Sequence, residues 1–368
     1  MKYFKQKVGD SVTLSQLNRI LIIIIAVTFR LVSLFYSSAI LNYFLLLVLV
    51  ALTFYNILTR KIEINQFRKI FILLLLSALI FFIYNEDSLF IYFIASLAFI
   101  DESDEKLIKY FTITAIVSFI SIIIAGQLGL INVVVATRYL DNSIVIRNSL
   151  GFGHVNTVSV YYLGIMFGIY YLFHQNKKKL ILIYILTTII AIYLYLETNC
   201  RTGLYIYIAF IIISLLYNKK LNKKLKKITP YNFIIFTILS FILAILFGKT
   251  LNNPINILLS SRPYFSLYYI KKGAFINLFG QDVISGYVLD NHYLSLLVRT
   301  GIIGFITYMY IIIKGSILLK KDYATMLIIL FYLIYGIFEA NLYGNFIIII
   351  LLKKIISSDG GEVNERKD

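Results

Sequence analysis

The chain alternates between long apolar segments and short polar ones from one end to the other. Runs such as Leu21–Val27, Leu45–Leu52 and Ile347–Leu352 contain no polar side chain. The pattern predicts about twelve membrane-spanning helices, near residues 18–37, 40–58, 69–84, 88–100, 107–125, 156–173, 180–196, 203–217, 231–247, 292–313, 323–340 and 343–356. Because the fourth and the last segments are short, counts of roughly ten or eleven also stay open. The predicted fold class is all-α and polytopic, since barrel strands would be shorter and would alternate in polarity.

Positive charge is concentrated in the short polar segments, which explains the net charge of +17 without nucleic acid. Lysines gather at Lys177–Lys179, Asn218–Lys227 and Lys320–Lys321. This distribution is typical of cytoplasmic loops and, with an even number of spans, places both termini in the cytoplasm. The acidic cluster Asp101–Glu105 falls on the same side. A single cysteine, Cys200, excludes an intrachain disulfide.

The opposite, extracytoplasmic side receives two long connections, residues 126–155 and 248–291, within one integral membrane domain spanning 1–368. Long loops among tight turns are a common place for function. Residues Tyr264–Ile276 of the second loop mix apolar and basic positions, which predicts a short interfacial helix. Three arginines lie at the outer ends of apolar segments: Arg147, Arg201 and Arg262. A cation at that depth favours a bound anion such as a lipid-linked diphosphate.

Two motifs surround the first two of these arginines. Arg147 opens the block Arg147–Asn156, which contains two glycines and His154. The block suits either a substrate site or a capped helix start with Asn156 or Thr157 as the N-cap. The second motif, Asn199–Gly203, places an arginine at a helix N-terminus, which is a favourable arrangement for diphosphate. An arginine that reaches out to lipid headgroups is the alternative.

Two further motifs lie later in the chain. Ser260–Pro263 leads into the predicted interfacial helix, with proline suited to the first turn. Asp290–Leu294 offers the Asp290 carboxylate and the His292 imidazole as general bases, or Asp290 or Asn291 as a helix cap. Further candidates for lining the same cavity are Asn156, Asn291, Glu339, Tyr264 and Tyr293, together with Asn341. The histidines His154, His174 and His292 are scattered, so we expect no metal and no cofactor.

Taken together, these motifs resemble the Wzy-type polymerases of polysaccharide repeat units, which are relatives of the O-antigen ligases. The likeness covers about residues 110–345 and rests on Arg-x-x-Leu-Gly-Phe-x-His-x-Asn, a motif close to Ser-Arg-Thr-Gly, then Ser-Arg, and Asp-Asn-x-Tyr-Leu before Gly-Ile-Ile-Gly. Val155 stands where the family usually has proline, and Cys200 where it has serine. Aligning Gly301 and Gly304 puts Asp290 where the ligases carry histidine, which favours a polymerase over a ligase.

The resemblance implies a GT-C-like fold in the plasma membrane of a bacterium, with an active site on the extracytoplasmic side. It implies an inverting transfer of a growing glycan, as in capsule, exopolysaccharide or O-antigen synthesis, from a polyprenyl (undecaprenyl) diphosphate onto a lipid-linked repeat unit. The expected diphosphate ligands are Arg201 and Arg262, with Arg147 third. Asp290 is the first choice for the base, with His154 and His292 as rivals. The expected partners are the lipid-linked oligosaccharide, membrane lipids and a chain-length regulator.

Two alternatives stay open. One is ligase-like transfer of the glycan to another acceptor. The other is a flippase or transporter of lipid-linked oligosaccharide, for which we expect inverted repeats and helices broken near the midplane. The chain has only Pro230, Pro254 and Pro263, none within a predicted span, so the sequence predicts no such break.

Overall fold

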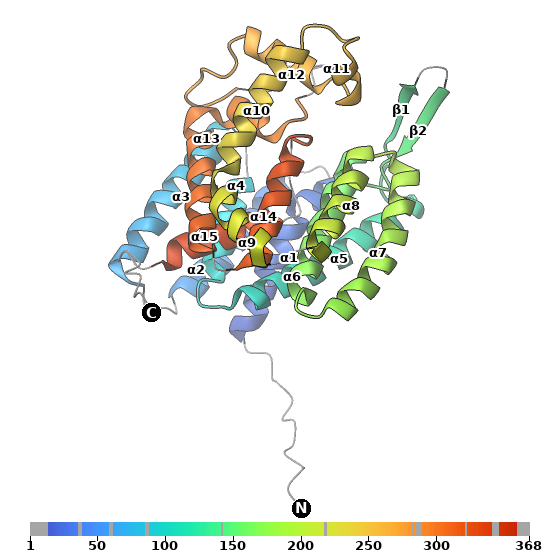
Figure 1. Ribbon diagram of the computed structural model, residues 1–368. Coiled ribbons are helices and arrows are strands. Elements are labelled where there is room, and N and C mark those ends of the chain that lie inside the picture. Colours follow the sequence, from blue (N-terminus) through green and yellow to red (C-terminus); the bar gives the residue numbers. More distant parts are fainter. Residues whose placement is uncertain are drawn as a thin grey trace, which may run out of the picture.

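A computed structural model (Figure 1) describes residues 14–35, 39–58, 62–84, 88–140, 143–216, 219–281, 283, 289–320, 322–340 and 346–358. Its helices are α1 (Leu14–Phe35), α2 (Ala39–Leu58), α3 (Ile64–Tyr84), α4 (Ser88–Ala98), α5 (Asp104–Gln127), α6 (Val155–Phe173), α7 (Lys177–Thr198), α8 (Arg201–Leu216), α9 (Lys219–Ile228), α10 (Asn232–Phe247), α11 (Pro254–Leu258), α12 (Arg262–Lys271), α13 (His292–Leu318), α14 (Tyr323–Gly336) and α15 (Ile347–Ser357). A 3₁₀ turn, η1 (Thr229–Tyr231), joins α9 to α10, and β1 (Val135–Leu140) pairs antiparallel with β2 (Ser143–Asn148).

The outer helices of the bundle expose apolar faces. Leu47 and Phe54 on α2, Ile189 on α7 and Ile238 on α10 are each more than half exposed. Side chains of this kind in a continuous layer are stable only against lipid. Seven helices within the described ranges are long and apolar enough to cross a membrane, so the prediction of a polytopic helical membrane protein is confirmed at that level. Every one of the predicted segments overlaps a helix, but the count of about twelve spans stays a prediction.

The core of the bundle is formed by helices that the others surround. Residues Ile347–Leu352 of α15 are almost completely buried, between α13 and α4. The Phe210 ring of α8 lies 5.0 Å from that of Phe167 on α6 and 5.2 Å from that of Phe331 on α14. Aromatic contacts of this geometry fix α6, α8 and α14 against one another. This packing matters for function because α6 and α8 both begin at the cavity described below.

One end of the bundle is held together by ion pairs. The Lys353 ammonium on α15 lies 2.5 Å from Asp104 at the start of α5, and Arg19 on α1 pairs with Glu102. Lys177 begins α7 near this end, and α7 then runs for about 33 Å to Thr198 at the other. The motif of Arg201 therefore lies at the end of the bundle opposite Lys177.

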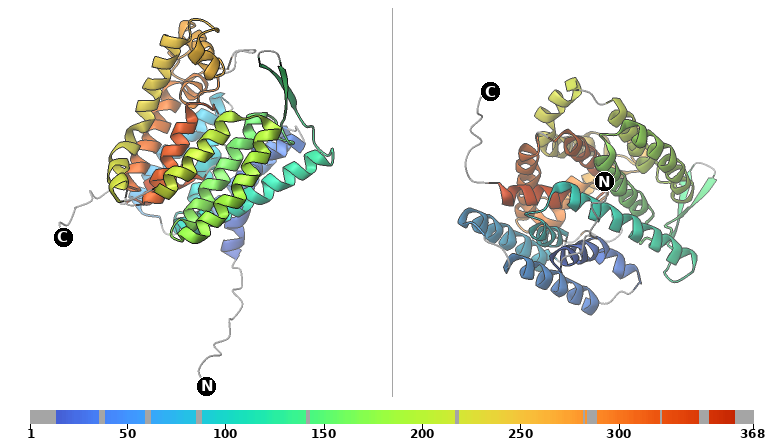
Figure 2. Two further views of the ribbon diagram at one scale, coloured as in Figure 1. Left: turned by 45° about the vertical axis from the view of Figure 1, so that its right-hand side comes forward. Right: turned by 90° about the horizontal axis from the view of Figure 1, so that it is seen from below.

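The other end is covered by α11 and α12, and the β1–β2 hairpin stands away from the bundle beside it (Figures 1 and 2). The fold class predicted from the sequence was all-α, and this hairpin was not expected. The lysine-rich segment Asn218–Lys227 was expected to be a loop, whereas most of it forms α9. A helix overlaps the segment Tyr264–Ile276, namely α12, which begins at Arg262 with Pro263 in its first turn and ends at Lys271; its interfacial position stays a prediction.

Helix α13 is broken at Gly301, contrary to the prediction that no span contains a break. Gly301 has φ 65° and ψ −169°, a conformation that glycine adopts without a steric penalty. Residues 277–281 approach the break and satisfy its backbone, through Gln281 N–H to Val298 O at 2.7 Å, Ile302 N–H to Asn277 O at 3.0 Å and Ile303 N–H to Leu278 O at 3.1 Å. Glycine and proline both break helices, but the prediction was based on the positions of the three prolines, and here glycine breaks the helix.

Candidate functional site

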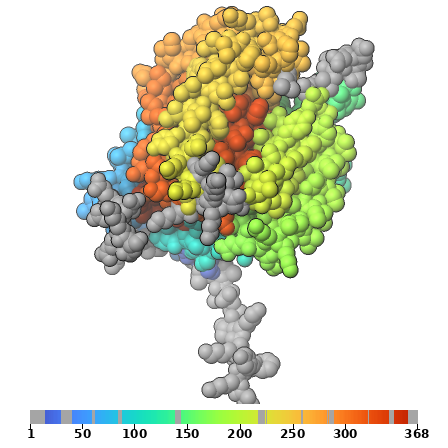
Figure 3. All heavy atoms as spheres, viewed as in Figure 1, coloured from blue at the N-terminus to red at the C-terminus, as the bar shows by residue number. Residues whose placement is uncertain are grey.

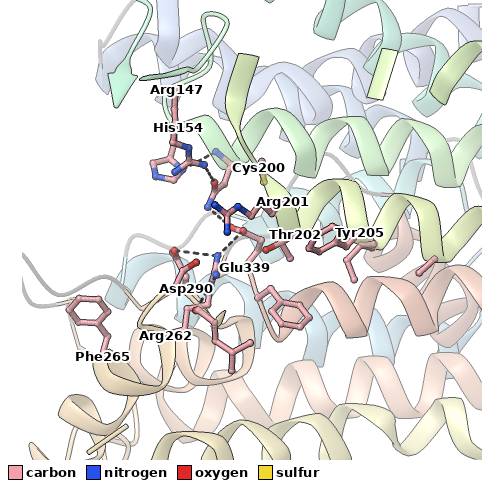
Figure 4. Close-up of a pocket in the computed structure, with 16 residues that line it drawn as sticks. Arg147, His154, Cys200, Arg201, Thr202, Tyr205, Arg262, Phe265, Asp290 and Glu339 are labelled. Atoms are coloured by element: carbon pink, nitrogen blue, oxygen red, sulfur yellow. Dashed lines mark hydrogen bonds and ion pairs between the residues drawn. The ribbon is translucent and has the colours of Figure 1, made fainter. Parts of the chain in front are cut away.

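A cavity of about 660 Å³ opens at the end of the bundle that carries the hairpin and α12 (Figure 4). Its lining comes from segments that are far apart in the sequence: Arg147, His154, Asn156, Cys200, Arg201, Thr202, Tyr205, Ile206, Ala209, Leu259, Ser260, Arg262, Phe265, Asp290, Phe338 and Glu339. The structure thus gathers the three predicted arginines, Asp290, His154, Asn156 and Glu339 around one space.

Arg201 reaches the cavity from the first residue of α8. Asn199 ends α7 in the left-handed conformation at φ 47°, which lets the chain turn into α8 within two residues. Gly203 then allows α8 to approach α6, because a Cβ atom at this position would overlap the Ser159 side chain. Among the residues that the structure describes, the Arg201 guanidinium has no hydrogen-bond or ion-pair partner. It is the cavity cation most available to a ligand.

Arg147 lies near the end of β2 and is held by neutral acceptors. Its Nε donates to the Thr198 carbonyl at 2.7 Å, and its Nη2 donates to Asn156 Oδ1 at 2.8 Å. Asn156 was predicted, with Thr157, as a cap of α6, but the N-cap is His154, whose Nδ1 accepts the Asn156 backbone N–H at 3.2 Å. The Asn156 side chain is instead committed to Arg147 and Glu339.

Arg262 projects from the start of α12 toward two carboxylates. Its Nη2 lies 3.2 Å from Glu339 Oε1 and 3.8 Å from Asp290 Oδ2. The preceding residues Ser260 and Ser261 both have positive φ, 54° and 63°. A pair of non-glycine residues in this region costs on the order of 2 kcal/mol or more, and such strain is concentrated at functional sites. The strained turn is what directs Arg262 into the cavity.

Glu339 lies in the turn beyond α14 and is buried at 5% exposure. Besides the Arg262 contact, its Oε2 accepts from Asn156 Nδ2 at 3.4 Å. Burial raises the pKa of the Glu339 carboxyl to about 8, although Arg262 acts in the opposite direction. Arg147, Asn156, Glu339, Arg262 and Asp290 therefore form one continuous chain of polar contacts along the cavity wall.

Three helices have first-turn residues in the cavity lining: α6, α8 and α12. Each helix N-terminus carries a partial positive charge of roughly +0.5 and peptide N–H groups that the helix itself does not use. These main-chain charges add to three guanidiniums, which outnumber the two carboxylates. The cavity is therefore suited to a multiply charged anion.

His154 is placed to donate a hydrogen bond to such an anion. Partial burial of its ring lowers the pKa of the imidazole, although the nearby Asp290 carboxylate opposes this shift. Because Nδ1 accepts the helix-capping bond, the neutral ring carries its proton on Nε2. His154 is in this form a better donor than base.

The other predicted site residues that the structure describes lie outside the cavity lining. His292 Nδ1 lies 2.9 Å from the Ala340 carbonyl, and Tyr293 is fully buried with its hydroxyl donating to Leu333 O at 2.5 Å. Asn291 is the N-cap of α13, as one of the two sequence readings had it. Tyr264 lies on α12 outside the lining, and Asn341 falls outside the described residues. In the described part of the chain, no three His, Cys, Asp or Glu side chains are grouped for a metal ion.

Sequence reasoning missed the apolar wall of the cavity. On α8, Thr202, Tyr205, Ile206 and Ala209 follow the i, i+3, i+4, i+7 spacing of one helical face. Leu259, Phe265 and Phe338 complete the wall from other segments. The spacing on α8 was visible in the sequence, but in a membrane helix an apolar stripe faces lipid or protein with equal ease.

Comparison of the chain with protein-family models, with curated proteins and with solved structures finds no match. The fold and the site define a helical membrane protein of several spans with an anion-suited cavity at one end of its bundle.

Proposed function

We propose that the protein is a membrane glycosyltransferase that polymerises lipid-linked oligosaccharide repeat units. In this proposal the GT-C-like bundle crosses the plasma membrane of a bacterium about twelve times, with the cavity on the extracytoplasmic side. The observation that carries it is the convergence of Arg147, Arg201 and Arg262, from three separate segments, on one cavity at the end of the bundle opposite Lys177–Lys179.

The polar half of the cavity suits the diphosphate of the donor. Arg201 contributes a guanidinium without a protein partner, and Arg262 and the helix N-termini surround the same space. In a glycosyl transfer from a lipid diphosphate, negative charge grows on the leaving diphosphate. Each fixed donor aimed at that charge is worth roughly 3–4 kcal/mol in the transition state. Arg147, already bound to neutral acceptors, holds Asn156, which in turn donates a hydrogen bond to Glu339.

The apolar half suits the first isoprene units of the carrier. The Tyr205, Ile206 and Ala209 face of α8 leads from the arginines along the helix. Figure 3 shows α14 at the bottom of a hollow between α8 and α10, below α12. A chain in that hollow would remain next to the bilayer while its diphosphate occupies the cavity.

The reaction is a single displacement at the anomeric carbon. A hydroxyl of the acceptor repeat unit forms the new C–O bond, the bond to the diphosphate oxygen breaks, and its electron pair leaves with the diphosphate. The hydroxyl proton passes to a carboxylate, for which Asp290, the more exposed of the two in the cavity, is our choice. His154 donates to the sugar or to the diphosphate through Nε2.

A transporter of the same lipid-linked substrate is the second candidate, because the break at Gly301 is a feature of many transporter helices. Against it, the peptide groups at this break are bonded to residues 277–281 and not turned toward a substrate path. The two functions differ in whether a glycosidic bond forms.

The decisive experiment incubates the purified protein in lipid vesicles with a polyprenyl-diphosphate-linked repeat unit. A ladder of products supports the polymerase, whereas translocation without a ladder supports the transporter. Arg201→Met and Arg262→Met are expected to abolish the ladder. Lys271→Met, which removes an exposed cation at the end of α12 outside the cavity, is the matched control and should leave it intact. A normal ladder in either arginine variant would refute the diphosphate argument.

A further inference from the structure

The three cavity arginines differ in what they are already bonded to. Arg201 has no partner among the described residues, and Arg147 is held by an amide oxygen and a peptide carbonyl. Only Arg262 faces carboxylates, Glu339 at 3.2 Å and Asp290 at 3.8 Å, both on Nη2. An anionic ligand of Arg262 must therefore compete with negative charge that belongs to the protein.

Glu339 is the carboxylate with less access to water. Its side chain is 6% exposed, whereas that of Asp290 is 28% exposed and keeps its hydration. If a ligand takes the Nη2 of Arg262, Glu339 retains one neutral donor, Asn156 Nδ2 at 3.4 Å. A buried carboxylate that loses its cation binds a proton, because the charged form is no longer compensated.

Titratable groups from several elements face Glu339, namely Arg262, Asp290, Arg147, Cys200 and Tyr335. The two uncharged members, the Cys200 thiol and the Tyr335 hydroxyl, are both buried, and burial raises the pKa of the Cys200 thiol. Both groups therefore already carry their proton and cannot take up another. Proton uptake on loss of the Arg262 contact then falls to Glu339, the carboxylate with less access to water.

We infer that Glu339 is a displaceable counter-ion of Arg262, which a diphosphate replaces and a single phosphate does not, and that the displaced carboxylate takes up a proton. The inference rests on the proposed function for the identity of the diphosphate ligand. It gives Glu339 a role in specificity. A single phosphate that contacts only Arg262 gains too little to offset the loss of the Glu339 contact, whereas a diphosphate contacts Arg201 and Arg262 together. On release of the diphosphate, Glu339 returns to Arg262.

Calorimetric titration of the purified full-length protein in detergent tests this, with inorganic pyrophosphate and inorganic phosphate as probes. Titrations at one pH somewhat above 8, where the Glu339 carboxyl is largely ionised in the free protein, in two buffers of different ionisation enthalpy give the number of protons taken up. We expect wild type to take up more protons with pyrophosphate than Glu339→Gln does. The protonation of pyrophosphate itself is common to both proteins and cancels. Glu339→Gln should bind pyrophosphate on the order of tenfold more tightly, and should prefer it less strongly over phosphate.

Asp290→Asn is the matched control, because it removes the more distant and more hydrated carboxylate, and its effects should be smaller on every count. Equal or weaker pyrophosphate affinity in Glu339→Gln, with unchanged proton uptake, would overturn the inference. If wild type also builds a glycan ladder, the proposed function survives that result. Conversely, Glu339-dependent proton uptake without a ladder would retain the inference and remove the polymerase. A wild-type protein that binds no pyrophosphate would remove both.

Discussion

Replacing Arg201 or Arg147 by methionine tests whether the two arginines have different roles, one as a ligand of the anion and the other in positioning its neighbours. Methionine keeps an aliphatic stem and removes the guanidinium in both cases. Arg201→Met deletes a group with no partner among the described residues, so the free energy of unfolding should change by no more than about 0.5 kcal/mol. Arg147→Met deletes bonds of 2.7 and 2.8 Å and leaves the buried Asn156 side chain short of a donor.

Bonds from a charged donor contribute about 1.5–3 kcal/mol each, and partial exposure reduces this, so Arg147→Met should cost roughly 2–4 kcal/mol. For a chain of 368 residues, about 1.3 °C of melting temperature corresponds to each kcal/mol. Thermal unfolding in detergent should therefore show a loss of roughly 3–5 °C for Arg147→Met and almost none for Arg201→Met.

Pyrophosphate affinity should change in the opposite sense. Loss of an uncommitted guanidinium from a diphosphate site costs roughly 2 kcal/mol or more, which weakens binding about 30-fold. Arg147→Met should weaken it less, because that guanidinium is already engaged. Calorimetry on both variants measures this. Should Arg201→Met melt as early as Arg147→Met while binding pyrophosphate normally, the division between an anion ligand and a positioning residue would be refuted.

Three further predictions concern other parts of the structure. Gly203→Ala should lower the free energy of unfolding by roughly 1–3 kcal/mol and weaken pyrophosphate binding, because the new Cβ overlaps Ser159. Adding Ser159→Gly to the same chain should restore both stability and affinity. Failure to restore either property would contradict the packing argument. Lys353→Met breaks a buried ion pair with Asp104 and should lower the free energy of unfolding by roughly 2–4 kcal/mol without affecting pyrophosphate binding. A large change in affinity would contradict the placement of this ion pair and the cavity at opposite ends of the bundle. Burial raises the folded-state pKa of Glu339 from 4.5 to about 8, so its contribution to stability is fully present below pH 4.5 and is lost as the pH rises toward about 8. As the pH rises across that window, the melting temperature of Glu339→Gln should fall less steeply than that of wild type. Parallel slopes would exclude Glu339 as the source of this pH dependence.

The helices were predictable because a run such as Leu45–Leu52 has few alternatives to a bilayer. The relative positions of the helices were not predictable, since the apolar residues of α15 and α2 look alike although the first are buried and many of the second are exposed. The hairpin was missed because its strands are short and lie in a loop. The break at Gly301 depends on a distant segment, residues 277–281, that satisfies its peptide groups.

The charged residues of the cavity could be selected from the sequence because an arginine at the edge of an apolar segment is costly without a partner. The role of each arginine in the cavity could not be predicted from the sequence, because it depends on contacts with distant residues. Arg147 binds acceptors on Thr198 and Asn156, and Arg262 pairs with Glu339. His292 looked equivalent to His154 in sequence, yet it packs against Ala340 away from the cavity. Roles within a site follow from contacts between distant residues, which spacing alone does not reveal.

The convergence of three helix starts has a consequence for how mutational data on this protein are interpreted. Partial charge on peptide groups survives every side-chain replacement, so even a variant stripped of all cavity guanidiniums would keep an attractive potential for phosphates. Substitution of the cavity side chains one after another will therefore leave a residual affinity for phosphate, and this residual affinity is the contribution of the main chain.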